Sequence, residues 1–248
     1  MTVVAAATRT RSRVVIVEDH VVFAESLELA LNLEGYDARW LSPPTGFARI
    51  TDLVAAVARL QPRVVLLDLD LGIFGDGARL IHPIAATGAN VVVVTSSTDR
   101  SRWGECMRAG ARRTIAKTQP LNDMLSVVRR IHEGLPVVDA AEREELLTRW
   151  EDKRAEVEEQ RALLESLTCR EREVLAQLRL GRSVREVARA SVVSEATVRS
   201  HVKAILAKLG VSSQIAAVGL ANRAGWADGV LVSRPLGGRG RREPCGTG

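Results

Sequence analysis

Five polar residues in the first half of the sequence carry the side chains that phosphoryl transfer needs. They come at the ends of short apolar runs and are Glu18, Asp19, Asp68, Thr95 and Lys117. Clustered carboxylates repel, so a site built from them either shifts a pKa or holds a cation. Oxygen ligands with room for water suit Mg²⁺, which Glu18, Asp19 and Asp68 would hold. Asp68 could then act as a nucleophile and form an aspartyl phosphate, while Lys117 and Thr95 meet the phosphoryl oxygens.

The elements that must position these residues follow an alternating pattern. The apolar runs are too short for helices and rich in valine, as buried parallel strands are. They are Val14–Val17, Val64–Leu67 and Val91–Val94, with weaker strands expected at Tyr36–Leu41 and Arg113–Ala116. Helices are expected between them, at about 20–33, 49–60, 76–87, 98–109 and 121–134. Such repeats predict a doubly wound α/β domain, in which a five-stranded parallel sheet brings the polar residues to one edge.

This pattern resembles the receiver domain of two-component response regulators over about residues 13–134. The resemblance implies a flavodoxin-like fold in which Glu18 and Asp19 are the acidic pair and Asp68 is the phosphoacceptor. Thr95 would be the switch hydroxyl and Lys117 the lysine of the pocket. It also implies Mg²⁺ as the cofactor and a sensor histidine kinase as the phosphodonor.

Three residues depart from the receiver pattern. Thr114 stands where an aromatic switch residue is usual, Thr118 replaces the proline that often follows the lysine, and Gly72 replaces the proline after the phosphoacceptor. The acceptor chemistry does not need these residues. A coupling between Thr95 and an aromatic side chain, however, cannot operate in its usual form.

A helix-turn-helix is predicted in the second half of the chain. Thr168 and Ser183 are each followed three residues later by Glu, which is the capping box of a helix start, and Ser194 is a third N-cap. The first expected helix starts at Thr168. The second covers roughly 183–190, the third runs over 194–209, and a further helix is expected around 213–224. The result is a small all-α domain.

The helix 194–209 has two distinct faces. Val198, Val202, Ile205 and Leu209 have the spacing of a buried stripe. The other side combines small residues, hydroxyls and cations, as a helix in a DNA major groove does. The candidate DNA contacts are Thr197, Arg199, Ser200, Lys203 and Lys208.

The segment Leu167–Val211 resembles the LuxR/NarL-type DNA-binding domain. The motifs that carry the resemblance are the run from Leu167 to Leu175, Glu186-Val-Ala188, the run from Ser194 to Lys203, and Lys208-Leu-Gly-Val211. The match implies binding to double-stranded DNA, as a homodimer on two half-sites. Cys169 departs from the usual proline and Ser191 from a core leucine. We expect Ser191 to cost roughly 1–3 kcal/mol if it is buried.

Charge and composition agree with a DNA-binding protein. The net charge of +5 divides into +2 over residues 1–138, −5 over 139–169 and +8 over 170–248, so the basic excess lies with the helix-turn-helix. The sequence has no apolar run of membrane-spanning length and no signal-peptide core. Its three cysteines are too scattered for a disulfide framework or a zinc site, which favours the cytoplasm.

A long charged segment without Pro or Gly, residues 139–166, is predicted as a single helix. Leu146, Trp150, Val157 and Leu164 fall on a broken heptad, so it is either a solvated connector or a weak dimerising coiled coil. Both ends of the chain are predicted to be disordered. The predicted division is tail, receiver-like domain, helical linker, DNA-binding domain and basic tail: 1–12, 13–138, 139–166, 167–228 and 229–248.

The sequence therefore predicts a DNA-binding transcription regulator controlled by phosphorylation of Asp68, not an enzyme. One alternative is a regulator of the same family that responds to a ligand or a partner. A more distant one is a phosphatase with Asp68 as nucleophile and Asp70 as general acid, because Asp68-Leu-Asp70 also resembles the DxD motif of haloacid-dehalogenase-type enzymes. A third is an interaction protein built around helix 139–166 that does not bind DNA.

Overall fold

The valine-rich runs form a five-stranded parallel sheet, which confirms the predicted fold class of the first domain. A computed structural model of the chain describes residues 12–43, 49–227 and 230–231. The strands lie in the order β2-β1-β3-β4-β5. Their bounds are β1 Arg13–Val17, β2 Asp37–Leu41, β3 Val64–Asp68, β4 Asn90–Thr95 and β5 Arg113–Ala116.

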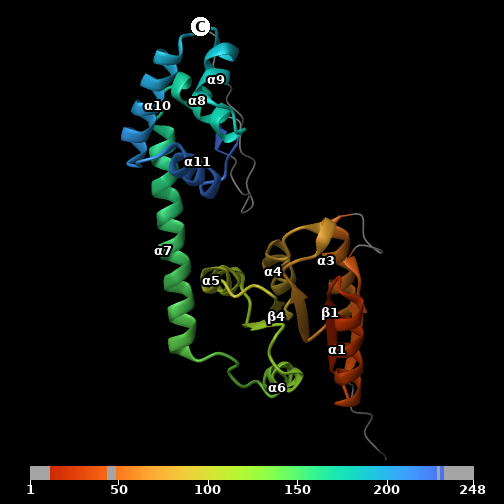
Figure 1. Cartoon of the computed structure of the whole chain (residues 1–248). Helices are drawn as coiled ribbons and strands as arrows, with labels where there is room; N and C mark the ends of the chain where they lie inside the picture. The colour runs from red at the N-terminus through yellow and green to blue at the C-terminus, as the bar shows by residue number, and fades with distance from the viewer. Residues whose placement is uncertain (1–11, 44–48, 228–229, 232–248) are drawn as a thin grey trace, which may run out of the picture. The chain divides into compact units, whose positions relative to one another are not determined.

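Helices cover both faces of this sheet (Figure 1). Alternate residues of a strand point to opposite faces: Val15 and Val17 pack with residues of α3, α4 and α5, whereas Val14 and Ile16 pack with residues of α1 and α6. Each aliphatic side chain buried in this way contributes about 1.5–3 kcal/mol. The bounds are α1 Val21–Leu33, α3 Ile50–Leu60, α4 Ala78–Ala85, α5 Arg100–Ala109 and α6 Leu121–His132, with a 3-10 turn, η1, at Gly72–Phe74.

The second unit is a group of short helices around its own core. Thr168 and Ser183 form complete capping boxes and Ser194 caps the third helix, as predicted from the sequence. The helices are α8 Cys169–Arg179, α9 Val184–Ser191, α10 Glu195–Leu209 and α11 Gln214–Arg223. The fold thus follows the predicted order of an α/β domain and then a small helical domain.

The folded part of the chain extends beyond the predicted start of the C-terminal tail at residue 229. Strand β6, Trp226–Ala227, pairs antiparallel with β7, Val230–Leu231. Trp226 is buried in the core of the second unit, and Arg179 lies 5.5 Å from the centroid of its ring. The predicted tails at residues 1–11 and 232–248 lie outside the described residues.

Helix α7, Ala140–Glu165, is continuous across the boundary between the units Met1–Glu151 and Asp152–Gly248. Its bounds agree with the predicted helix 139–166. Leu146 is buried in the core of the first unit and Leu164 in the core of the second. Two side chains of the predicted heptad are therefore buried in cores of this chain. A coiled coil that used them would have to withdraw them from both cores.

Among the residues that the structure describes, no single helix is long and apolar enough to cross a membrane. Helices α10 and α11 pass such a test only when they are taken together, and they are bent by 55° where they meet. Both contribute buried residues to the core of the second unit.

Candidate phosphoryl pocket and nucleic-acid interface

The ends of four parallel strands, β1, β3, β4 and β5, bring the predicted pocket residues together. The register pairs Val17 of β1 with Leu67 of β3, so Glu18 and Asp68 emerge side by side. The residue after β5, Lys117, donates its backbone N–H to the carbonyl oxygen of Thr95 at 2.8 Å. Glu18, Asp68 and Thr95 are almost fully buried. The sheet thus collects at one edge residues that are far apart in the sequence.

The ammonium of Lys117 joins two buried carboxylates. Its Nζ donates to Asp68 Oδ2 at 2.9 Å and lies 2.8 Å from Glu18 Oε2. The same Nζ lies 5.1 Å from the ring centroid of Phe23. Burial acts to lower the pKa of Lys117, but the hydrogen bonds to Glu18 and Asp68 outweigh it and raise that pKa. Lys117 is therefore a fixed positive charge beside the candidate phosphoacceptor.

Asp68 is the most perturbed carboxylate of the pocket. Burial raises the pKa of Asp68 to about 6, against the lowering effect of the Lys117 hydrogen bond, and the nearby Glu18 raises it further. A carboxylate whose charge is made costly by burial is stabilised by a nearby cation. A cation in the pocket would therefore favour the charged, nucleophilic form of Asp68 further.

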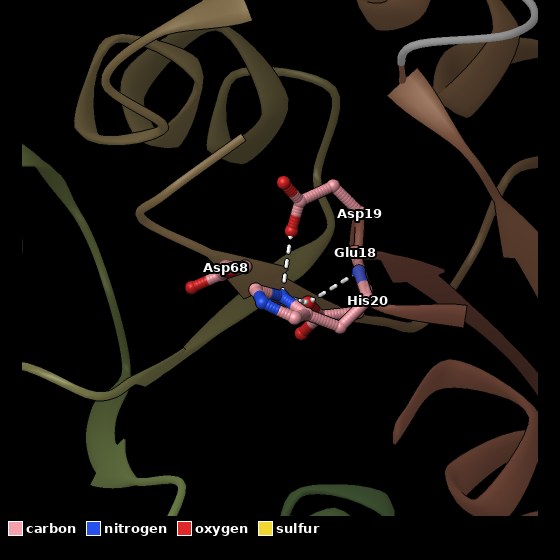
Figure 2. Close-up of side chains that lie close together, drawn as sticks. All are labelled: Glu18, Asp19, His20 and Asp68. Carbon is pink, nitrogen blue, oxygen red and sulfur yellow. Dashed lines mark hydrogen bonds and ion pairs between the residues drawn. The ribbon is translucent and has the colours of Figure 1, made fainter. Parts of the chain in front are cut away.

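His20 lies beside the pocket carboxylates, although the sequence alone indicates no more than a surface or helix-terminal residue. It is exposed and precedes α1, yet its Nδ1 lies 2.9 Å from Glu18 Oε1 and 2.8 Å from Asp19 Oδ1. Figure 2 shows its ring beside these carboxylates and Asp68. The hydrogen bond to Glu18 raises the pKa of His20. The signal that could have found it is its place directly after Glu18 and Asp19.

The carboxylates fit a divalent cation. Ligand atoms of Glu18, Asp19, His20 and Asp68 all lie within 4.8 Å of one another. Asp19 Oδ1 is buried and has no hydrogen-bond donor among the described residues, since its contact with His20 is an ion pair without hydrogen-bond geometry. Three carboxylates and Lys117 give a net charge of −2 when ionised, which one Mg²⁺ would neutralise. The donor set of oxygens therefore suits the predicted Mg²⁺ site.

Two glycines shape the loop after the phosphoacceptor. Gly72 has a φ of +56°, a conformation that the proline usual at this position cannot adopt, and a Cβ there would lie 3.2 Å from Asp19 Oδ2. A Cβ at Gly77 would lie 2.1 Å from the carbonyl oxygen of Asp68. The loop backbone thus comes close to the pocket only because these side chains are absent.

The two threonines of the predicted switch region have different partners. Thr95 Oγ1 accepts a hydrogen bond from the Ser97 N–H at 3.1 Å. Thr114, in the place of the usual aromatic residue, is buried, and its hydroxyl has no hydrogen-bond partner among the described residues. No aromatic side chain can therefore follow a rotation of Thr95 at this position.

Helix α10 has the two faces expected from the sequence. Val198, Val202, Ile205 and Leu209 are buried in the core. The candidate DNA contacts on the other side are exposed; they are Thr197, Arg199, Ser200 and Lys203. Arg199 makes a surface ion pair with Glu195, at 3.2 Å, which is weak enough to exchange for a phosphate or a base. The face predicted for DNA is thus accessible in the second unit.

Lys208, the fifth candidate DNA contact, already has a structural partner. Its Nζ donates to Glu171 Oε2 at 2.7 Å, and this carboxylate also caps α8 by accepting from the Thr168 N–H. Burial acts to raise the pKa of Glu171, but the hydrogen bonds from Lys208 and Thr168 lower it. A phosphate contact by Lys208 remains a prediction, and it would compete with this ion pair.

The last residue of α9, Ser191, and the first residue of the turn that follows it, Val192, both bear on the stability of the second unit. Ser191, expected to be costly if buried, is exposed, so that cost does not arise. Val192 has a φ of +54° and is 91% exposed. A β-branched residue rarely adopts this left-handed conformation, which favours glycine. No sequence pattern around Val192 indicates this strain.

Known proteins are similar to this chain in both of its domains. Two family models match: the response regulator receiver domain over residues 14–129, and the bacterial regulatory proteins of the luxR family over residues 165–221. The transcriptional regulatory protein LnrK of Bacillus subtilis (strain 168) is 29% identical over 159 residues, covering 61% of this chain and 71% of LnrK. The response regulator protein VraR of Staphylococcus epidermidis is 31% identical over 169 residues, covering 67% of this chain and 77% of VraR. A solved structure of the two-component response regulator RcsB in complex with DNA shows 21% identity, covers 86% of this chain and 98% of RcsB, and has a TM-score of 0.47.

Proposed function

Because the chain belongs to the NarL/LuxR-type response regulators, we propose that phosphorylation of Asp68 controls its binding, as a homodimer, to operator DNA. Transcription regulation through a LuxR-type DNA-binding domain is the function of this family. The observation that supports phosphorylation is the pocket itself: a buried Asp68 with Lys117 at 2.9 Å and the carboxylates of Glu18 and Asp19 beside it. We expect the protein to act in the cytoplasm, with a sensor histidine kinase as phosphodonor.

The proposed reaction is a transfer of one phosphoryl group to Asp68. A carboxylate oxygen of Asp68 attacks the phosphorus, the bond from phosphorus to the donor atom breaks, and the leaving group keeps the bonding electrons and takes up a proton. Mg²⁺, held by Glu18, Asp19 and Asp68, would supply charge neutralisation at the phosphoryl oxygens. Lys117 would release Asp68 Oδ2 and bind a phosphoryl oxygen, while Thr95 would donate its hydroxyl to another.

Incubation with acetyl phosphate and Mg²⁺, followed by intact-mass measurement, tests the phosphorylation. We expect one added phosphoryl group on the wild-type protein and none on Asp68→Asn. A matched control is Asp52→Asn, which removes a carboxylate of helix α3 that pairs with Arg49 and is not one of the pocket residues. If the wild-type protein gained no mass, the alternative control by a ligand or partner would take the place of phosphorylation.

Self-association is supported by an exposed apolar stripe on helix α1. Val22, Leu29 and Leu33 are 78%, 63% and 80% exposed, and together with Ser26 they follow the 4-3-4 spacing of a helix-pairing seam. Monomeric proteins rarely leave such a stripe uncovered. A second copy of α1, related by a twofold axis, fits this self-complementary seam. We expect Leu29→Glu to shift sedimentation towards the monomer and Ser26→Cys to form a disulfide-linked dimer. A dimer unaffected by both changes would place the interface elsewhere.

The phosphatase alternative makes a different prediction at Asp70. This residue is exposed, and its Oδ1 lies 3.4 Å from the Gly72 N–H. A phosphatase would turn over a generic phosphomonoester and lose that turnover in Asp70→Asn. We expect neither the wild-type protein nor Asp70→Asn to turn over such a phosphomonoester.

A further inference from the structure

We propose that the first turns of helix α7 respond to the state of the Asp68 pocket, through a contact path that runs from Thr95 over Ser97 and Trp103 to Gly104. This path would replace the missing coupling between Thr95 and an aromatic residue. The inference rests on the proposed function, because phosphorylation of Asp68 is the event that sets it in motion.

Helix α7 lies directly against α5 at Gly104. A Cβ at this glycine would come within 2.0 Å of the Leu146 carbonyl oxygen and within 2.8 Å of the Trp150 Cβ. Only glycine permits this approach, because any side chain would overlap the backbone of α7. The packing of α7 against α5 therefore depends on the absence of a side chain at Gly104.

Charged groups on either side of this contact reinforce it. Glu145 of α7 pairs with Arg100 of α5 at 3.2 Å, and Glu142 pairs with Arg113 of β5 at 2.8 Å. Leu146, next to Glu145, is buried in the same core as the residues of α5. Residues 142–150 are thus docked on α5 and β5, while residues 151–156 of α7 are exposed.

A short series of hydrogen bonds connects this contact to the pocket. Thr95 Oγ1 accepts from the Ser97 N–H at 3.1 Å, and the Ser97 carbonyl oxygen accepts from Trp103 Nε1 at 2.9 Å. Trp103 directly precedes Gly104, and Arg100, the partner of Glu145, lies 5.5 Å from the centroid of its ring. The loop that follows β4 is therefore tied at one end to the switch hydroxyl and at the other to the surface that holds α7.

The response follows from a displacement of the Thr95 hydroxyl. When the Thr95 side chain rotates so that Oγ1 reaches a phosphoryl group on Asp68, Oγ1 moves away from the Ser97 N–H that it accepts from. The loop then shifts at Ser97, and the carbonyl oxygen that accepts from Trp103 Nε1 shifts with it. The fit of Leu146 against Gly104 is tight, so a small shift of α5 is enough to undock α7. The docked and undocked helix are then the two states whose populations the pocket changes.

Hydrogen exchange of the α7 amides, followed by mass spectrometry on the full chain, tests this inference. Gly104→Ala should release the helix and speed exchange in residues 140–150 by about tenfold or more. Thr95→Val, which removes the acceptor but keeps the shape, should speed exchange in the same segment although it touches no residue of α7. Gly219→Ala, at a helical glycine of α11 with room for a methyl group, is the matched control. Unchanged protection of residues 64–67 would show that each variant is folded.

The outcomes separate the inference from the proposed function. Wild-type protection of residues 140–150 in Thr95→Val would overturn the path, whether or not Asp68 accepts a phosphoryl group. Phosphorylation of the wild-type protein without any change in that segment would also overturn it. A failure of the mass increase, with both variants behaving as expected, would instead contradict phosphorylation alone.

Discussion

Lys117 Nζ lies 2.9 Å from Asp68 Oδ2, and the same ammonium lies 2.8 Å from Glu18 Oε2. Lys117 thus partly neutralises the pocket before any cation or phosphoryl group enters. It does not neutralise it fully, because Glu18, Asp19 and Asp68 carry more negative charge than one ammonium offsets. This imbalance makes the stability of the first unit sensitive to pH and to divalent cations.

The stability of the first unit should fall as the pH rises from about 4 to about 6 in the absence of divalent cations. The pKa of Asp68 is raised from 3.8 to about 6 in the folded state, mainly by burial. The folded state therefore binds more protons than the unfolded state in this window, and stability falls with rising pH. We expect Asp68→Asn to raise the free energy of unfolding at pH 7 by about 1–3 kcal/mol.

Chemical denaturation at several pH values with a chelator measures this effect. The wild-type protein and Asp68→Asn should converge near pH 4 and separate by pH 7. A variant less stable than the wild-type protein at pH 7 would show that the ion pair with Lys117 outweighs the cost of burying the charge.

Mg²⁺ should stabilise the first unit through the same carboxylates. A ligand at a hundred times its dissociation constant adds about 2.7 kcal/mol to the free energy of unfolding. Asp19→Asn should abolish most of this gain, since Asp19 Oδ1 is buried without a hydrogen-bond donor. Glu133→Gln, at the exposed C-terminal end of α6, is the control and should keep the full gain. An equal Mg²⁺ effect on the melting temperature of both variants would mean that the ion binds elsewhere.

Val192→Gly should stabilise the second unit. The left-handed conformation of Val192 costs about 1–2 kcal/mol, and glycine would remove this cost. Glycine also raises the conformational entropy of the unfolded chain, which offsets about half of the gain. The net gain expected is about 0.5–1 kcal/mol, measured by thermal unfolding. Val193→Gly is the control, because Val193 does not have a positive φ, and it should destabilise. A loss of stability in both variants would contradict the strain assigned to Val192.

Lys208→Ala should destabilise the second unit by about 1–2 kcal/mol, because it leaves the buried Glu171 with one hydrogen bond fewer. Denaturant unfolding measures the loss, and Lys208→Arg keeps the charge as a control. If Lys208 also contacts a phosphate, its removal should weaken binding to all duplexes alike. Unchanged stability with weakened binding would assign Lys208 to DNA alone.

Sequence patterns predicted the strands and the helix starts closely, for identifiable physical reasons. Valine-rich runs are interpretable because buried parallel strands require them, and β5 was predicted with the bounds that the structure gives it. The caps at Thr168, Ser183 and Ser194 are local hydrogen bonds within three residues. Interactions of this range can be inferred without knowing the fold.

The contacts that sequence could not predict depend on distant backbone atoms. The contact of Gly104 with the Leu146 carbonyl leaves no trace in hydrophobic periodicity, and the sequence places Leu146 in a possible dimer seam instead. The pairing of Lys208 with Glu171 likewise joins two helices. The position of His20 beside the carboxylates required the geometry of the strand end.

The central claim is that the cationic face of α10 binds duplex DNA, and a salt titration of binding to a fluorescent duplex tests it most directly. We predict that the logarithm of the affinity falls linearly with the logarithm of the salt concentration, by about 0.9 for each phosphate contact. Arg199→Ala combined with Lys203→Ala should flatten this slope and weaken binding, whereas Arg108→Ala, at an exposed residue of α5, should leave both unchanged. Equal affinity and slope in all three proteins would contradict the account.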